Sequence, residues 1–214
     1  MQLRIIRIKS EDRQVKSLIL KKPTGFTFYP GQYLDISLQK NTRAFSISTS
    51  PTEDFLMITT KKGISLFKKH LFSLKPGNLI KSSHPAGTFI LDEMSPAVFI
   101  AGGIGITPFR SMVKYAVDNK LKTPITLIFS NSNENFLFKD ELDLWQKSLP
   151  KLKIIYHNSI EKGRLTKLYP IPYTLYPIYY LAGSHSFVNA MEKILLEMGI
   201  DQTNIRYDRF DGYH

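Results

Sequence analysis

The sequence predicts a two-domain protein of 214 residues, with an antiparallel β-barrel over residues 1–94 and an α/β domain with a parallel sheet over residues 95–214. Three observations predict this fold class. Short β-like runs separated by turn residues fill the first part of the chain, strands alternate with amphipathic helices in the second, and no low-complexity linker lies between them. The length and composition suit two small globular domains.

The first domain opens with Leu3, Ile5, Ile6 and Ile8 interleaved with basic residues, which is typical of a strand. The other strand candidates are residues 15–20, 33–38, 44–48, 55–60 and 79–81. Turn signals separate them at residues 23–25, 30–31, 51 and 76–77. Strands at this spacing favour a small antiparallel barrel.

In the second domain the strand candidates are residues 97–101, 126–129, 153–156 and 178–181. Helical patterns cover residues 108–118, 139–148 and 187–198, and Gly199 suits the left-handed position after the last helix. Alternation of this kind predicts a largely parallel sheet with helices on its faces.

Composition excludes several classes of chemistry. The chain has no cysteine, which rules out disulfide frameworks, cysteine nucleophiles and all-cysteinyl iron–sulfur clusters. It also has no run of eighteen apolar residues, and its N-terminus reads as a strand and not as a signal peptide. We therefore expect a cytoplasmic protein with no membrane insertion, and no metal site is predicted.

The net charge of +11 is uneven along the chain. Residues 1–92 hold fifteen Lys and Arg against six Asp and Glu, or +9, whereas the remaining residues hold fourteen against twelve, or +2. Such a surface attracts an acidic protein partner or a phosphate-bearing ligand, or it is a solvated face that keeps the protein soluble. Nucleic-acid binding is not predicted, because no zinc-finger spacing or basic heptad accompanies the charge.

A glycine-rich turn, with Gly102, Gly103 and Gly105, follows an apolar strand and leads into a helix. Without Cβ atoms these residues let backbone N–H groups approach a diphosphate, and the helix N-terminus favours an anion. Thr107 is predicted as the helix N-cap, followed by Pro108 as first helical residue. The spacing is not G-x-G-x-x-G, so a purely structural turn stays open.

Gly183 and Ser184 form a second turn, after the strand candidate at residues 178–181 and before the last helix. If both strands are parallel, both turns lie at the carboxyl edge of the sheet, where open α/β sheets bind ligands. In the barrel half, Arg43-Ala44-Phe45-Ser46 lies on a strand that sends Arg43 and Phe45 to one face. A guanidinium suits phosphate and an aromatic ring suits a planar ligand, although Phe is more often core.

These residues together resemble the ferredoxin–NADP reductase family over nearly the whole chain. Residues 43–46 are similar to its arginine-x-tyrosine-serine flavin motif, residues 63–65 to its second flavin segment, residues 85–89 to its domain-closing turn, and residues 101–108 to its nicotinamide-nucleotide loop. The resemblance implies FAD, with FMN less favoured, as bound cofactor, and NADH or NADPH as co-substrate. Hydride transfer then occurs where the two domains meet, and the chemistry belongs to the cofactors.

The resemblance also implies residue roles. Ser46 lies near flavin N5 and Thr107 near the nicotinamide, and these two are the catalytic candidates. The cofactor-binding candidates are Arg43, Phe45, Ser46, Ile47, Ser48, Gly63, Ile64, Ser65, Gly102, Gly103, Gly105, Thr107, Ser130, Ser132, Gly183, Ser184, Phe210 and Tyr213. Phe210 or Tyr213 is expected to cover the exposed face of the flavin, unless the terminus packs elsewhere.

Two departures from the family pattern bear on function. Phe45 replaces the commoner tyrosine and lacks its hydroxyl, and Ala182 replaces a cysteine that many relatives carry. Where relatives often place an arginine toward the 2′-phosphate of NADP, this chain has Ser132, with Glu134 nearby, which favours NADH.

Three functions are weighed. The favoured one is an NAD(P)H-dependent flavoenzyme that passes electrons to a ferredoxin, a flavodoxin or another iron–sulfur protein, with the acidic acceptor docking on the basic first domain. The second is an NAD(P)H:free-flavin reductase. The third is a non-catalytic accessory subunit of a redox complex.

Overall fold

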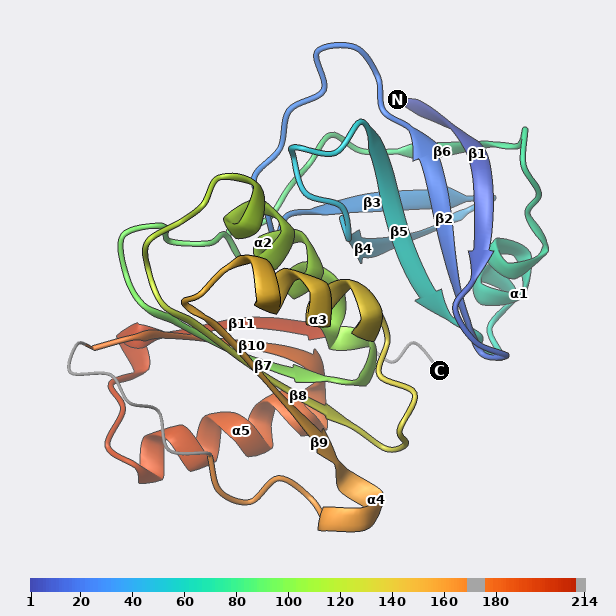
Figure 1. Cartoon of the computed structure of the whole chain (residues 1–214). Helices are drawn as coiled ribbons and strands as arrows, with labels where there is room; N and C mark the ends of the chain where they lie inside the picture. The colour runs from blue at the N-terminus through green and yellow to red at the C-terminus, as the bar shows by residue number, and fades with distance from the viewer. Residues whose placement is uncertain (169–175, 211–214) are drawn as a thin grey trace. The chain divides into compact units, whose positions relative to one another are not determined.

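The computed structural model describes residues 1–168 and 176–210, and the chain forms two compact units (Figure 1). Among the described residues, the first unit comprises Met1–Leu91 together with Arg110–Tyr115, and the second comprises Asp92–Phe109 and the residues from Ala116 to Phe210. Each unit has its own sheet. The functional division at residue 94 stays a prediction.

The first unit is a six-stranded antiparallel sheet with the order β4-β3-β6-β1-β2-β5. Its strands are β1 (Gln2–Ser10), β2 (Val15–Lys21), β3 (Tyr33–Leu38), β4 (Asn41–Ser46), β5 (Phe55–Lys61) and β6 (Leu79–Ser82). A bridge between Ile47 and Ile58 joins the chain just after β4 to β5, so the two edges of the sheet meet. The predicted antiparallel barrel is therefore confirmed.

Alternating residues of these strands fill the interior of the barrel, because successive side chains on a strand point to opposite faces. In β3, for example, Leu34, Ile36 and Leu38 are buried while the residues between them are partly exposed. The helix α1 (Leu66–Ser73) adds Phe67 and Leu71 to this core. Helix α1 was not predicted from the sequence, because residues 63–65 were interpreted only as a ligand-binding segment.

The second unit is a five-stranded parallel sheet with the order β11-β10-β7-β8-β9 (Figure 1). The strands are β7 (Ala97–Gly102), β8 (Ile125–Asn131), β9 (Leu152–Asn158), β10 (Ile178–Ser184) and β11 (Ile205–Phe210), and all four strand pairs are parallel. This confirms the predicted α/β domain. The strand order reverses between β7 and β10, so the topological switch point lies between these two strands.

Helices follow the strands of the second unit. They are α2 (Ile106–Asp118), α3 (Lys139–Ser148), the short α4 (Ser159–Lys162) and α5 (His185–Glu197), and α3 and α5 lie on opposite sides of the sheet in Figure 1. Three residues of α5, Val188, Met191 and Leu195, form one apolar core with alternate residues of β7 and β10. Met198 is the C-cap of α5, and Gly199, the residue after the cap, has the predicted left-handed conformation with φ of +79°.

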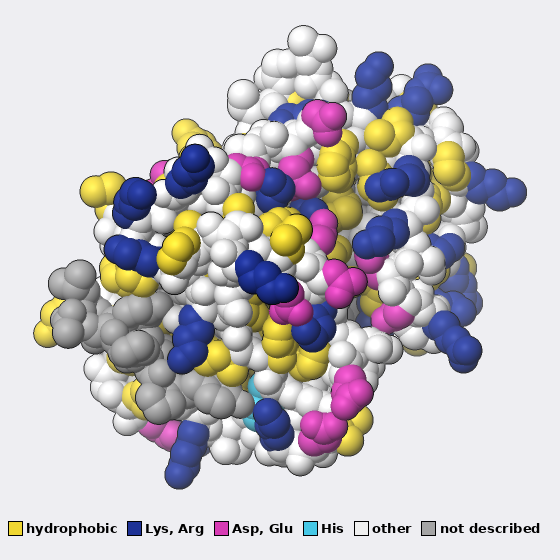
Figure 2. All heavy atoms as spheres, in the orientation of Figure 1, with side chains coloured by type: hydrophobic (Ala, Val, Ile, Leu, Met, Phe, Trp, Pro, Cys, Tyr) yellow, Lys and Arg dark blue, Asp and Glu magenta, His cyan; other side chains and the backbone are white. Residues whose placement is uncertain are grey.

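Among the described residues, no helix is long and apolar enough to cross a membrane. On the face drawn in Figure 2, Lys and Arg side chains crowd the surface over the strands and α1 of the first unit. The exposed residues of this unit include Arg4, Arg7, Lys61, Lys62, Lys69 and Lys81. The excess of basic residues in the first 92 positions is thus displayed on the surface of that unit.

Candidate functional site

Arg43 is the first predicted ligand residue of the first unit, and it lies on β4. Its Nη1 atom donates a hydrogen bond to the carbonyl of Thr42 at 2.9 Å, and its guanidinium lies 5.8 Å from the centre of the Phe67 ring. The side chain is half-buried. A planar guanidinium held against an aromatic ring is oriented for bidentate recognition of a phosphate.

Phe45, two residues along the same face, lies in the core of the barrel. Its ring stacks on that of Phe67 at 6.1 Å with an angle of 17° between the planes, and only 7% of the residue is exposed. The Nζ atom of Lys68 lies 4.9 Å from the centre of the Phe45 ring. Protein groups thus already pack against this ring, and the predicted contact of Phe45 with a planar ligand stays a prediction.

Lys68 was not identified from the sequence, and it is the most perturbed cation in this region. Burial lowers the pKa of its ammonium group to about 8. The ammonium donates a hydrogen bond of 2.6 Å to the hydroxyl of Thr60, which is 1% exposed. A lysine whose charged form is disfavoured by burial gains most from an anion placed beside it.

Ser65 is the N-cap of α1, and its hydroxyl accepts a hydrogen bond from the backbone N–H of Lys68 at 3.3 Å. Gly63 packs closely on the same lysine, since a Cβ atom there would lie 3.0 Å from Lys68 Cγ. Ile64, between them, is 81% exposed. The second predicted ligand segment therefore leads directly into the helix that carries Lys68.

Ser46, Ile47 and Ser48 form the end of β4 and the turn that follows, and all three are buried. Ile47 is 0% exposed and belongs to the barrel core, while the Ser48 hydroxyl donates to Thr59 Oγ1 at 3.3 Å. Their backbone N–H groups donate to the carbonyls of Gln32 and Met57. The structure thus places the side chains of Ile47 and Ser48 against protein groups, and their contact with a ligand stays a prediction.

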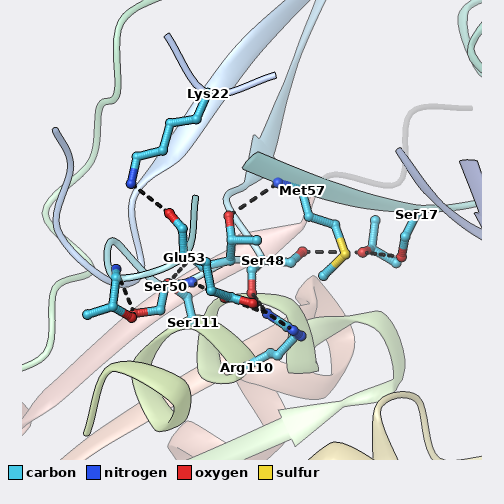
Figure 3. Close-up of polar contacts among 11 residues, drawn as sticks. Ser17, Lys22, Ser48, Ser50, Glu53, Met57, Arg110 and Ser111 are labelled. Atoms are coloured by element: carbon cyan, nitrogen blue, oxygen red, sulfur yellow. Dashed lines mark hydrogen bonds and ion pairs between the residues drawn. The ribbon is translucent and has the colours of Figure 1, made fainter. Parts of the chain in front are cut away.

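A polar network fixes residues 48–53, which follow this segment (Figure 3). The Arg110 guanidinium donates to Glu53 Oε2 at 3.0 Å, to Glu53 Oε1 at 3.2 Å and to the Ser48 carbonyl at 2.9 Å. Ser111 donates its hydroxyl to the Thr49 carbonyl at 2.6 Å. Arg110 and Ser111 were not identified from the sequence, because their partners lie about sixty positions away.

In the second unit, the predicted glycine turns come together at the carboxyl edge of the sheet. Gly102, the last residue of β7, pairs in register with Ser130 of β8. On the other side, a Cβ atom at Gly183 would lie 3.2 Å from the Gly102 carbonyl oxygen. Gly102, Ser130 and Gly183 therefore meet at the switch point of the sheet, where parallel α/β sheets bind ligands.

The glycines of the first turn serve different purposes. A Cβ atom at Gly105 would lie 2.1 Å from the backbone oxygen of Ala182, and one at Gly102 would lie 2.6 Å from the Phe187 ring. These two residues permit close packing against β10 and α5. Gly103 instead has φ of +53° and open space around its Cβ position, where only the Asn131 side chain lies 4.0 Å away. Gly103 is thus the glycine that leaves room for a ligand.

Thr107 is not the N-cap of α2, which corrects the sequence prediction. Residues Gly103–Gly105 form a 3₁₀ turn, and the Ile106 N–H donates to the carbonyls of Gly103 and Ile104, so the chain is already helical before Thr107. The Thr107 hydroxyl donates to the Ile104 carbonyl at 3.1 Å, and the residue is 3% exposed. Pro108 is the third residue of the helix and not its first.

Ser132 lies in the exposed loop after β8. The loop is closed by its own amides, since Asn131 Nδ2 donates to Asn133 Oδ1 at 2.8 Å and to the Asn135 carbonyl at 3.0 Å. Residues 130–135 contain no Lys or Arg, and Glu134 is exposed. The loop therefore presents hydroxyl and amide groups together with one carboxylate.

Ser184 is exposed and caps α5, with its hydroxyl accepting a hydrogen bond from the Phe187 N–H at 3.3 Å. It lies opposite Phe210 in the register of β10 with β11. The strand β11 was not predicted from the sequence, because residues 206–210 were interpreted as part of a short aromatic tail. Tyr213 lies outside the described residues.

The donors of the two units suit phosphate-bearing ligands. The first unit offers Arg43, Lys68 and the α1 N-terminus capped by Ser65. The second unit offers the open backbone at Gly103 and the α5 N-terminus capped by Ser184. Among the described residues, no group of three or more His, Asp or Glu side chains is placed to hold a metal ion.

Comparison with protein families gives a match to the oxidoreductase NAD-binding domain over residues 99–168. Among curated proteins, the chain is 30% identical to Flavohemoprotein A of Dictyostelium discoideum over 211 residues, which cover 86% of this chain and 53% of that protein. The chain thus spans little more than half the length of this relative.

Solved structures share the fold. The flavohemoglobin of Malassezia yamatoensis, solved with bound FAD and heme, superposes with a TM-score of 0.85 and 23% identity, over 98% of this chain and 60% of that one. The ferredoxin-NADP+ reductase of Plasmodium falciparum superposes with a TM-score of 0.81 and 20% identity, over 98% and 95%. The second match covers nearly the whole of both chains.

Proposed function

Since the chain belongs to the ferredoxin–NADP reductase-like family of flavin oxidoreductases, we propose that it carries electrons from a nicotinamide dinucleotide through bound FAD to a separate acceptor protein. The observation that carries this proposal is the switch point of the parallel sheet, where Gly102, Ser130 and Gly183 meet beside the open backbone of Gly103. When bound, the flavin supplies the redox chemistry, because it accepts a hydride and releases electrons one at a time.

The first unit holds the flavin in this proposal. Arg43 and Lys68 bind its phosphates, with Ser65 and the first turn of α1 completing the anion site. Ser46 donates or accepts a hydrogen bond at the reactive edge of the ring. FAD is favoured over FMN because the flavohemoglobin with the same fold was solved with FAD.

The second unit holds the nicotinamide dinucleotide. Gly103 would admit its diphosphate, Ser184 caps the helix on the other side of the switch point, and Thr107 would lie near the nicotinamide. In this proposal Phe210 or Tyr213 would cover the exposed face of the flavin ring and would be displaced by the nicotinamide. We propose NADH as the preferred donor, because the loop at residues 130–135 offers Ser132 and Glu134 and no cation for a 2′-phosphate.

The acceptor is a protein with an acidic surface, and it docks on the basic first unit in the cytoplasm. Ferredoxin, flavodoxin and other iron–sulfur proteins meet this description. The curated relatives are named flavohemoproteins, a name that indicates a haem group as well as a flavin, and the match covers only 53% of Flavohemoprotein A. These two facts favour a haem protein as a second acceptor class. A ferredoxin and a haem protein, each added to the reduced protein, distinguish the two.

The test is a visible spectrum of the purified protein under anaerobic conditions, before and after addition of NADH or NADPH. We expect a yellow protein whose flavin band is bleached by NADH faster than by NADPH, and heat-released cofactor that is FAD. A colourless protein that oxidises NADH only with added free flavin indicates the free-flavin reductase. A protein that neither binds flavin nor oxidises NADH is the non-catalytic accessory subunit.

A further inference from the structure

The turn after the flavin motif is held by one buried guanidinium. Arg110 is 3% exposed and Glu53 12%, so their ion pair is almost wholly removed from water. The same guanidinium donates to the Ser48 carbonyl, and Glu53 Oε2 also accepts the Ser50 N–H at 2.7 Å. One side chain therefore fixes both ends of residues 48–53, as Figure 3 shows.

Neighbouring contacts restrain the rest of this turn. Ser111 binds the Thr49 carbonyl, and Lys22 donates to the carbonyls of Pro51 at 2.7 Å and Glu53 at 2.8 Å. Ser48, where the Arg110 contact is made, follows Ser46 by two residues. The Ser46–Ser48 segment is therefore held at one end by the pairing of Ser46 with Tyr33 and at the other end by Arg110.

Stability alone does not explain such a pair. Replacing a buried ion pair by apolar or neutral residues of similar size is often neutral for stability, because desolvation of two charges offsets their attraction. The pair fixes the orientation of the chain segments that it joins, because a planar guanidinium and a carboxylate bind each other in one geometry. Such orientation matters most where a protein atom must lie within a fraction of an ångström of its ideal position relative to a ligand atom.

We propose that Arg110, through its pairing with Glu53 and Ser48, is a positioning residue that sets the Ser46–Ser48 segment against the bound flavin. The inference rests on the proposed function. It assigns a role in the flavin site to a helix residue that follows the nicotinamide-nucleotide loop in the sequence.

The test is the double variant Arg110→Met/Glu53→Gln, which removes both charges and leaves neither buried alone. We expect this variant to melt close to the wild type, to bind FAD about tenfold more weakly, and to reduce its flavin with NADH at least about tenfold more slowly. The flavin absorption band of the variant should shift toward that of free FAD. Ser111→Ala should change the same quantities in the same direction by about twofold.

The matched control is Arg209→Met/Glu192→Gln, which removes a partly buried pair of 2.8 Å in the second unit. We expect wild-type FAD affinity and spectrum for this control. If the Arg110 double variant does not fold, Arg110→Lys keeps the charge but loses the bidentate geometry, and the same shifts are expected. The proposal is overturned if a folded Arg110 variant keeps the wild-type FAD affinity and spectrum, or if neither variant folds. A wild-type protein that binds no FAD removes the proposed function itself.

Discussion

The two groups of ligand residues are held in place by different kinds of contact. At the sheet edge of the second unit, backbone meets backbone, as at Gly105 against Ala182, and the register of β7 and β10 fixes the approach. In the first unit, long charged side chains reach across the fold, as Arg110 does to Ser48, 62 positions away. The first arrangement is sensitive to a single added methyl group, whereas the second is sensitive to charge.

The largest effect is expected from Gly105→Ala. The new Cβ atom would lie 2.1 Å from the Ala182 oxygen and 2.5 Å from its carbonyl carbon, so β10 or the turn must move. We expect the free energy of unfolding to fall by about 3 kcal/mol, at the upper end for overpacking. Urea denaturation measures this change.

Gly103→Ala is the matched control for this prediction. Its Cβ position is open, so only the positive φ of +53° is penalised, at about 1–2 kcal/mol. Equal losses in the two variants would contradict the distinction between a packing glycine and a ligand-facing glycine.

The charge-dependent side of the comparison is tested by Arg43→Ala. Loss of a charge-assisted hydrogen bond to phosphate corresponds to about 1.5–3 kcal/mol, so we expect FAD to bind about tenfold to a hundredfold more weakly. Flavin fluorescence titration measures the affinity, and the melting temperature of the flavin-free protein should hardly change. Arg7→Ala, on the exposed part of β1, serves as control and should bind FAD normally. Unchanged affinity in Arg43→Ala would remove Arg43 from the phosphate site.

The same difference explains what the sequence could predict. Strand and helix alternation and glycine turns are local patterns, and they predicted the sheet, the helix Lys139–Ser148 and the convergence of Gly102 with Gly183. The partners of Arg110 and the burial of Lys68 depend on contacts between distant segments. No periodicity reports such contacts, so both residues were missed.

One local prediction was wrong and two elements were not predicted, each for a physical reason. Thr107 carries a typical N-cap side chain, but the 3₁₀ turn before it had already started the helix. The helix α1 is short and lacks an acidic residue in its first turn, so it gave little helical signal. The strand β11 is at the edge of the sheet and carries Arg206, Asp208 and Arg209, which weaken an apolar alternation.

A smaller effect, on the choice between NADPH and NADH, is expected from Ser132→Arg. This variant adds a charge to the second unit, where backbone contacts hold the ligand residues in place. A guanidinium in this exposed loop can meet the 2′-phosphate of NADPH. A gain of about 2 kcal/mol corresponds to a rise of about thirtyfold in the ratio of kcat/KM for NADPH over NADH. Steady-state kinetics with both donors measures the ratio, and Ser132→Ala should leave it near the wild-type value. A ratio that stays constant in Ser132→Arg would place the 2′-phosphate elsewhere.

The smallest effect concerns pH and separates Lys68 from Arg43. Burial lowers the pKa of Lys68 to about 8, from 10.5, so the flavin-free protein binds fewer protons than the unfolded chain between these values. Its stability should therefore rise with pH from about 8 to 10.5.

FAD affinity should change in the opposite direction, because only protonated Lys68 attracts phosphate. We expect it to be constant below pH 8 and about tenfold lower at pH 9, since the proton lost must be regained on binding. Lys68→Met should bind FAD weakly with no such slope, and Lys68→Arg, which stays charged, should bind it well across the range. A slope that persists in Lys68→Met would assign the titration to another group.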